Sequence, residues 1–113
     1  MKTGSMKTNT REPAIRELKH ALEKRFGKSI RLYLFGSSAR DEHSELSDID
    51  VLVLIHEKVT NALEEEIFTI AYQLELKYNV VFGIMAFSSE FWDSKKASAM
   101  PIYENIAQEG VRL

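Results

Sequence analysis

The chain has 113 residues, with 15 lysines and arginines against 17 aspartates and glutamates, and it has no cysteine. A chain of this length forms one domain. Its formal net charge of −2 gives no strong footprint for nucleic-acid binding. The lack of cysteine excludes disulfides, thiolate chemistry and cysteine-bound zinc. We find no signal peptide and no long apolar run, which predicts a cytoplasmic protein that does not associate with a membrane.

The predicted elements follow one another closely along the chain. Residues 1–9 lack apolar periodicity, so we expect a disordered or vector-derived terminus there and a single domain over residues 10–113. The expected helices cover residues 13–26, 61–77, a short segment from 88 to 92, and 101–108. The expected strands cover residues 30–35, 49–55 and 80–87. A polar loop is expected over residues 41–46, and Gly27 is expected to end the first helix.

A glycine–serine turn and two aspartates stand between the first two expected strands. Asp48 and Asp50 open the second strand at alternate positions, so their side chains project to the same face. Two carboxylates on one face repel each other unless a cation neutralises them, and hard oxygen ligands suit Mg²⁺. The Gly36-Ser37 turn offers backbone amides nearby, and glycine lets a phosphate approach the backbone closely. The combination predicts a nucleoside-triphosphate site, against the simpler alternatives of solvated carboxylates and an ordinary turn.

The two segments are Gly36-Ser37-Ser38-Ala39-Arg40 and Ser47-Asp48-Ile49-Asp50. Followed by an apolar strand, they resemble the signature of the minimal nucleotidyltransferases, a family in the DNA polymerase β-like nucleotidyltransferase superfamily. The resemblance implies an α/β (α+β) fold, a small mixed β-sheet flanked by helices.

The resemblance also assigns roles to individual residues. Gly36 and Ser37 would contact the β- and γ-phosphates at a helix start, and Asp48 and Asp50 would be the catalytic ligands of one or two Mg²⁺ ions. Arg40 would be a phosphate-binding or loop-anchoring cation. A surface ion pair between Arg40 and an acid of the following loop is nearly as good an interpretation.

The sequence departs from the resembled family at one position. Full nucleotidyltransferases of this type carry a third carboxylate on the following sheet strand, whereas residues 79–87 contain no acid. Gly83 is the expected occupant of that place, with Glu90 or a residue of a partner as the competing source of the acid. Two aspartates can still hold one Mg²⁺ on a nucleotide, but activation of an incoming hydroxyl loses a ligand and a base.

Two functions of different classes follow. The resemblance implies a protein that binds Mg-NTP, most plausibly ATP, and transfers a nucleoside monophosphate to a hydroxyl with release of pyrophosphate, as the antitoxin of a HEPN-domain toxin. The alternative is a catalytically weak or inactive module that binds a nucleotide or a partner. The chain is too short to carry an extra substrate-gripping domain, so substrate choice would come from a partner or from a second copy in a homo-oligomer.

Overall fold

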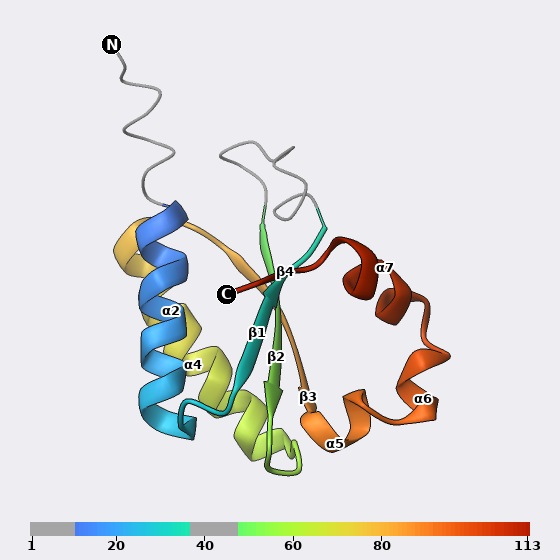
Figure 1. Cartoon of the computed structure of the whole chain (residues 1–113). Helices are drawn as coiled ribbons and strands as arrows, with labels where there is room; N and C mark the ends of the chain where they lie inside the picture. The colour runs from blue at the N-terminus through green and yellow to red at the C-terminus, as the bar shows by residue number, and fades with distance from the viewer. Residues whose placement is uncertain (1–10, 37–47) are drawn as a thin grey trace.

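The computed structural model describes residues 11–36 and 48–113, which form a four-stranded sheet with helices on both sides (Figure 1). The strands are β1 (Arg31–Leu34), β2 (Ile49–Ile55), β3 (Phe82–Ser88) and β4 (Val111–Arg112). The helices are α2 (Arg11–Phe26), α4 (Asn61–Tyr78), α5 (Ser89–Trp92), α6 (Lys95–Ser98) and α7 (Pro101–Glu109). Among these helices none is long and apolar enough to cross a membrane.

The sheet is mixed, as predicted, and its strand order is β3-β2-β1-β4. Strand β1 runs antiparallel to both β2 and β4, whereas β2 and β3 are parallel and are connected by the crossover helix α4. A parallel connection needs such a crossover, while antiparallel neighbours do not. The register places the first residues of β2 beside the first residues of β3, so the ends of β1, β2 and β3 nearest the glycine–serine turn meet at one edge of the sheet.

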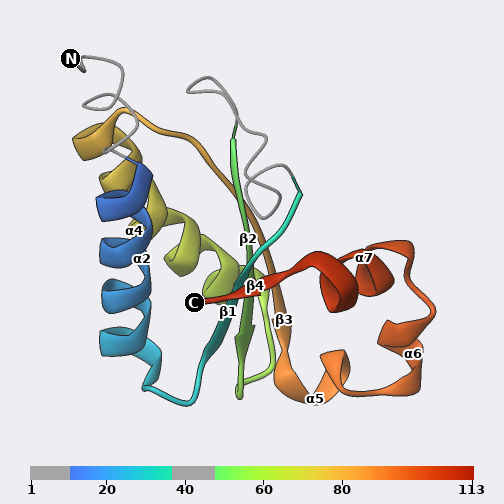
Figure 2. The same ribbon diagram turned by 45° about the horizontal axis from the view of Figure 1, so that its top comes forward.

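Two hydrophobic cores lie on opposite faces of the sheet. Helices α2 and α4 cover one face, and the short helices α5, α6 and α7 cover the other (Figures 1 and 2). Strand β2 contributes to both cores because its side chains alternate between the two faces. The buried residues toward α2 and α4 are Ile49, Val51, Val53 and Ile55. Leu52 and Leu54 pack with Trp92 and Ile106 on the other face, and the same alternation places Asp50 on that face.

The two long helices pack against each other through apolar and charged contacts. Leu18 and Leu22 of α2 are fully buried in the same core as Ile67 and Leu74 of α4. At the helix surface, Glu17 accepts hydrogen bonds from Lys77 Nζ, at 3.0 and 3.2 Å, and from the Tyr78 hydroxyl.

The predicted boundaries are close to the observed ones. Strand β2 has the predicted ends, and α2 begins two residues before the predicted start. Gly27 ends α2 with φ +93° and donates a backbone hydrogen bond to Glu23 O at 2.8 Å. Ser88 caps α5 by accepting a hydrogen bond from Phe91 N at 3.1 Å. Helix α6 and strand β4 were not predicted, and the expected loop 41–46 lies outside the described residues.

Candidate functional site

Asp50 lies at the end of the sheet where β1 ends and β2 and β3 begin. Its backbone carbonyl accepts a hydrogen bond from Phe35 N at 3.1 Å, which fixes the end of β1 beside it. On its other side, Asp50 is the register partner of Gly83 in β3. Gly36 of the first predicted motif segment and Asp50 of the second are therefore brought together at this carboxylate.

The Asp50 carboxylate is held between two glycines. A Cβ atom built on Gly36 would lie 2.6 Å from Asp50 Oδ2, and one built on Gly83 would lie 2.7 Å from Asp50 Oδ1. Real Cβ atoms essentially never approach another heavy atom this closely. Gly36 also has φ +65°, a conformation that residues with a side chain adopt at a cost. Glycine at both positions therefore leaves room for the carboxylate and for a ligand placed against it.

Asp48 and Asp50 influence each other electrostatically. Burial raises the pKa of Asp50, and the negative charge of Asp48 raises it further. Asp48 lies just before β2 and is exposed, whereas Asp50 is half-buried. Two neighbouring carboxylates repel each other when both are ionised. A divalent cation bound between them would reduce this repulsion.

Arg11 is a further charged residue of this site, and the sequence interpretation missed it. It is the first residue of α2 and only 6% exposed. Its positive charge lowers the pKa of Asp50, in opposition to burial and Asp48, while burial lowers the pKa of Arg11 itself. Burial of the Arg11 charge is unfavourable, and so is a positive charge at the N-terminus of a helix, where the helix dipole is also positive. The negative charge of Asp50 offsets part of this cost. The sequence contains no motif around Arg11 that signals this electrostatic interaction.

The β3 position that faces Asp50 carries no carboxylate, and it is the position that the sequence predicted. Gly83 is the β3 residue that faces Asp50, so β3 contributes no acid there. Within residues 11–36 and 48–113, no group of three or more acids, histidines or cysteines could hold a metal ion. Glu90, the competing candidate, is wrong for this role. It follows the far end of β3, seven residues after Gly83, which places it roughly 20 Å along the strand direction.

The remaining predicted site residues, Ser37 and Arg40, lie outside the described residues. A small pocket adjoins the described part of the site. It has a volume of about 250 Å³ and is lined by Phe35 and Gly36 at the end of β1 and by Ile102, Asn105 and Glu109 of α7. This volume is below the range of about 300–1,000 Å³ typical of sites that enclose a whole small molecule. The pocket can therefore take only part of a nucleotide or of an acceptor.

Comparison with known proteins agrees with the resemblance inferred from the motifs. The nucleotidyltransferase domain family matches residues 15–106 of the chain. "Putative protein adenylyltransferase MJ0604" of Methanocaldococcus jannaschii is 32% identical over 100 residues, which cover 88% of this chain and 93% of that protein. MJ0141 of the same organism, which carries the same description, is 43% identical over 56 residues, covering 50% of this chain and 57% of that protein. The chain belongs to the nucleotidyltransferase domain family, among the minimal nucleotidyltransferases.

Solved structures show the same fold. A crystal structure of a toxin–antitoxin pair with AMP-PNP superposes with a TM-score of 0.55 at 19% identity, covering 89% of this chain and 70% of that one. A mutant of the toxin–antitoxin pair MntA–HpeT superposes with a TM-score of 0.52 at 16% identity, covering 82% of this chain and 67% of that one. These likenesses show that the chain shares the fold of the proteins it superposes with.

Proposed function

We propose that this protein binds a Mg-nucleoside triphosphate, ATP in particular, and transfers its nucleoside monophosphate to a hydroxyl group. The observation that carries the proposal is the Asp50 carboxylate, held between Gly36 and Gly83 with Asp48 and Arg11 acting on its charge. In this proposal Gly36 and Ser37 bind the β- and γ-phosphates, and Arg40 is a further cation for the phosphates. The pocket beside Gly36 would take part of the nucleoside or of the acceptor.

In this proposal Asp48 and Asp50 would hold a magnesium ion together with phosphate oxygens of the nucleotide. Asp48 and Asp50 are hard oxygen ligands, and the Asp48 charge acts on a neighbour whose pKa is already raised by burial. Gly36 and Gly83 keep side chains away from the same carboxylate. Bound Mg²⁺ would supply charge neutralisation for the triphosphate.

The chemistry requires an in-line displacement at phosphorus. The acceptor oxygen bonds to the α-phosphorus, the bond from that phosphorus to the bridging β-oxygen breaks, pyrophosphate leaves, and the hydroxyl proton is released to water. The chain's own contribution is to position the triphosphate and to hold negative charge at Asp48 and Asp50, because phosphoryl-transfer catalysis is almost entirely positioning and electrostatics.

A protein hydroxyl is the acceptor that the relatives favour. The two archaeal proteins are described as protein adenylyltransferases, and the structural neighbours are toxin–antitoxin pairs. We therefore propose an antitoxin that adenylylates a HEPN-type toxin. A cytoplasmic location would accord with ATP as the donor.

The test is calorimetric titration of the protein with ATP in the presence and absence of Mg²⁺. The double variant Asp48→Asn/Asp50→Asn should lose the Mg²⁺-dependent binding and keep its fold, because it removes two like charges from one face. Glu57→Gln, an exposed acid beyond the other end of β2, is the matched control for loss of charge. Unchanged Mg-ATP affinity in the double variant would disprove the site.

A second function is favoured by one observation, the glycine at the β3 position facing Asp50. Without an acid there, the protein would bind nucleotide and partner without efficient transfer. Incubation with α-labelled ATP, Mg²⁺ and a HEPN-type toxin encoded by a neighbouring gene distinguishes the two functions. Label on the toxin indicates transfer, whereas nucleotide binding without label indicates the binding module.

A further inference from the structure

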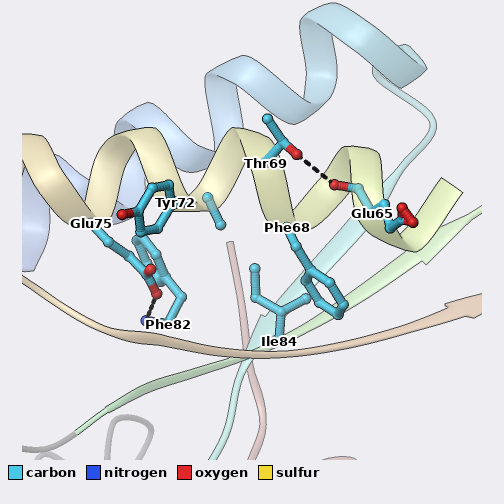
Figure 3. Close-up of a pocket in the computed structure, with 8 residues that line it drawn as sticks. Glu65, Phe68, Thr69, Tyr72, Glu75, Phe82 and Ile84 are labelled. Carbon is cyan, nitrogen blue, oxygen red and sulfur yellow. Dashed lines mark hydrogen bonds between the residues drawn. The ribbon is translucent and has the colours of Figure 1, made fainter. Parts of the chain in front are cut away.

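A second and larger groove lies on the face of the sheet opposite Asp50, between α4 and β3 (Figure 3). Its volume is about 550 Å³, within the range of about 300–1,000 Å³ typical of binding sites. Phe68 and Tyr72 project from α4 toward the strand, where Phe82 and Ile84 form the floor. Phe68 is 46% and Tyr72 57% exposed, so two aromatic side chains border the groove with much of their surface in water.

The groove runs along the outer edge of β3. Strand β3 ends the sheet, and none of the other described strands pairs with its outer side. Val81 O accepts from Ile49 N of β2, whereas Phe82 N points away from β2 and donates to Glu75 Oε2 at 2.7 Å. Because backbone groups alternate along a strand, the N–H and C=O groups of Ile84 and Ala86 also point outward.

Beyond Phe82, whose N–H is bonded to the Glu75 carboxylate, this edge lacks the features that commonly prevent strand addition. Residues 82–88 read Phe-Gly-Ile-Met-Ala-Phe-Ser, with no charged residue and no proline. Unprotected strand edges of this kind are templates for pairing with another chain. The open edge supplies main-chain hydrogen bonds, and the adjacent groove supplies room for apolar side chains.

The charge of the groove indicates which partner fits. Glu65 and Glu75 line it, and no lysine or arginine is among its lining residues. Neither acid takes part in a salt bridge with another of the described residues. A second copy docking by twofold symmetry would present the same acidic patch to itself, which is unfavourable.

We propose that the groove between α4 and β3 binds an extended, basic segment of a partner polypeptide, which adds to the sheet as a strand beside β3. The side chains of the added strand that point toward α4 occupy every second position. The apolar ones among them would lie against Phe68 and Tyr72, and the lysines or arginines among them would meet Glu65 and Glu75. This is recognition by strand addition, in which main-chain hydrogen bonds give affinity and pockets for alternate side chains give specificity. The proposal does not rest on nucleotide transfer, because the groove and Asp50 lie on opposite faces.

The test uses a short blocked peptide in which every second residue is threonine and the positions between the threonines are valine and lysine in turn, so that one face carries both. It is titrated into the ¹⁵N-labelled full chain at low ionic strength. We expect shifts of the Ile84 and Ala86 amide signals and slower hydrogen exchange at these two amides. The same peptide with glutamate in place of each lysine should bind at least about tenfold more weakly, and Glu65→Lys should weaken binding of the lysine-containing peptide. The double variant Phe68→Ser/Tyr72→Ser should also weaken it by about tenfold or more.

The matched control is Leu76→Ser, because Leu76 is a 68% exposed apolar residue of the same helix that does not line the groove. All variants change exposed side chains, and their melting temperatures verify the fold. Equal binding of both peptides, or no binding of either, would overturn the proposal. So would shifts at Phe68 and Tyr72 without protection of Ile84 and Ala86, which would indicate a helix in the groove. Self-association that slows exchange at these amides in the protein alone would identify a second copy as the occupant.

Discussion

Three glycine-to-alanine substitutions separate backbone strain from crowding of Asp50. Gly27 has φ +93° and open space around its Cβ position. Gly36 combines φ +65° with a Cβ position 2.6 Å from Asp50 Oδ2, whereas Gly83 has only the crowding, at 2.7 Å from Asp50 Oδ1. Gly27→Ala therefore introduces backbone strain alone, Gly36→Ala introduces strain and crowding, and Gly83→Ala introduces crowding alone.

The expected magnitudes differ between stability and binding. A side chain held at positive φ costs about 1–3 kcal/mol, offset by about 0.4–1 kcal/mol of lost entropy in the unfolded chain. Gly27→Ala should thus lower the free energy of unfolding by roughly 1–2 kcal/mol and leave Mg-ATP affinity unchanged. Gly36→Ala and Gly83→Ala must displace the Asp50 carboxylate. Both should therefore lower the affinity for Mg-ATP by at least about tenfold, which corresponds to about 1.4 kcal/mol.

Urea unfolding measures the stability of each variant, and titration calorimetry measures its affinity for Mg-ATP. Gly83→Ala is the decisive variant, because alanine is otherwise favoured over glycine within a strand by about 0.5–1 kcal/mol. Wild-type affinity in both Gly36→Ala and Gly83→Ala would refute the assignment of Asp50 to the nucleotide site. An equal loss of affinity in Gly27→Ala would show that general destabilisation, rather than the position of the carboxylate, controls binding.

Three further substitutions test the charges of the molecule. Arg11→Met should raise the pKa of Asp50, because the Arg11 charge lowers it; carboxyl NMR titration without metal measures this, and an unchanged pKa would contradict the contact. Gly83→Asp should lower the melting temperature in EDTA more than the isosteric Gly83→Asn does, and Mg²⁺ should reduce this difference, because a third carboxylate adds repulsion that a cation relieves; a difference between the two variants that Mg²⁺ does not change would count against a metal at Asp50. Glu17→Gln should destabilise the protein at pH 7 but not well below the ordinary glutamate pKa of about 4.3. Hydrogen bonds from Tyr78 and Lys77 lower the folded-state pKa of Glu17, so its stabilisation is present above the unfolded pKa and is lost as pH falls through the folded one; equal urea midpoints for wild type and variant at pH 7 would contradict this.

The sequence predicted the elements that carry their own pattern. Strand β2 is apolar on both faces beyond the aspartates, and its ends were predicted at the observed residues. Helix α6 has four residues, of which only Ala97 is buried, so no helical repeat is visible in it. Strand β4 consists of Val111 and Arg112, both exposed, and it is a strand only because β1 lies beside it. Elements this short depend on tertiary contacts that local patterns do not encode.

The site was predictable to a similar extent and for a similar reason. The spacing of Asp48 and Asp50 and the glycine turn are local features, and their relation follows from the geometry of a strand. Gly83 could be proposed as the vacant place because its strand has to align with β2. Arg11 could not be found, because its electrostatic interaction with Asp50 joins a helix start to a strand 39 residues later and depends on how α2 packs on the sheet.

The glycine at position 83 and the lack of a third acid have one physical cause at this site. Because a Cβ at 83 would lie 2.7 Å from Asp50 Oδ1, any side chain there competes with Asp50 for the same space. An acid at 83 therefore requires Asp50 to adopt another position. The two glycines and the half-buried aspartate form a unit that favours one fixed carboxylate beside the exposed Asp48. In the proposed function this unit would hold one Mg-nucleotide together with Asp48, which is exposed.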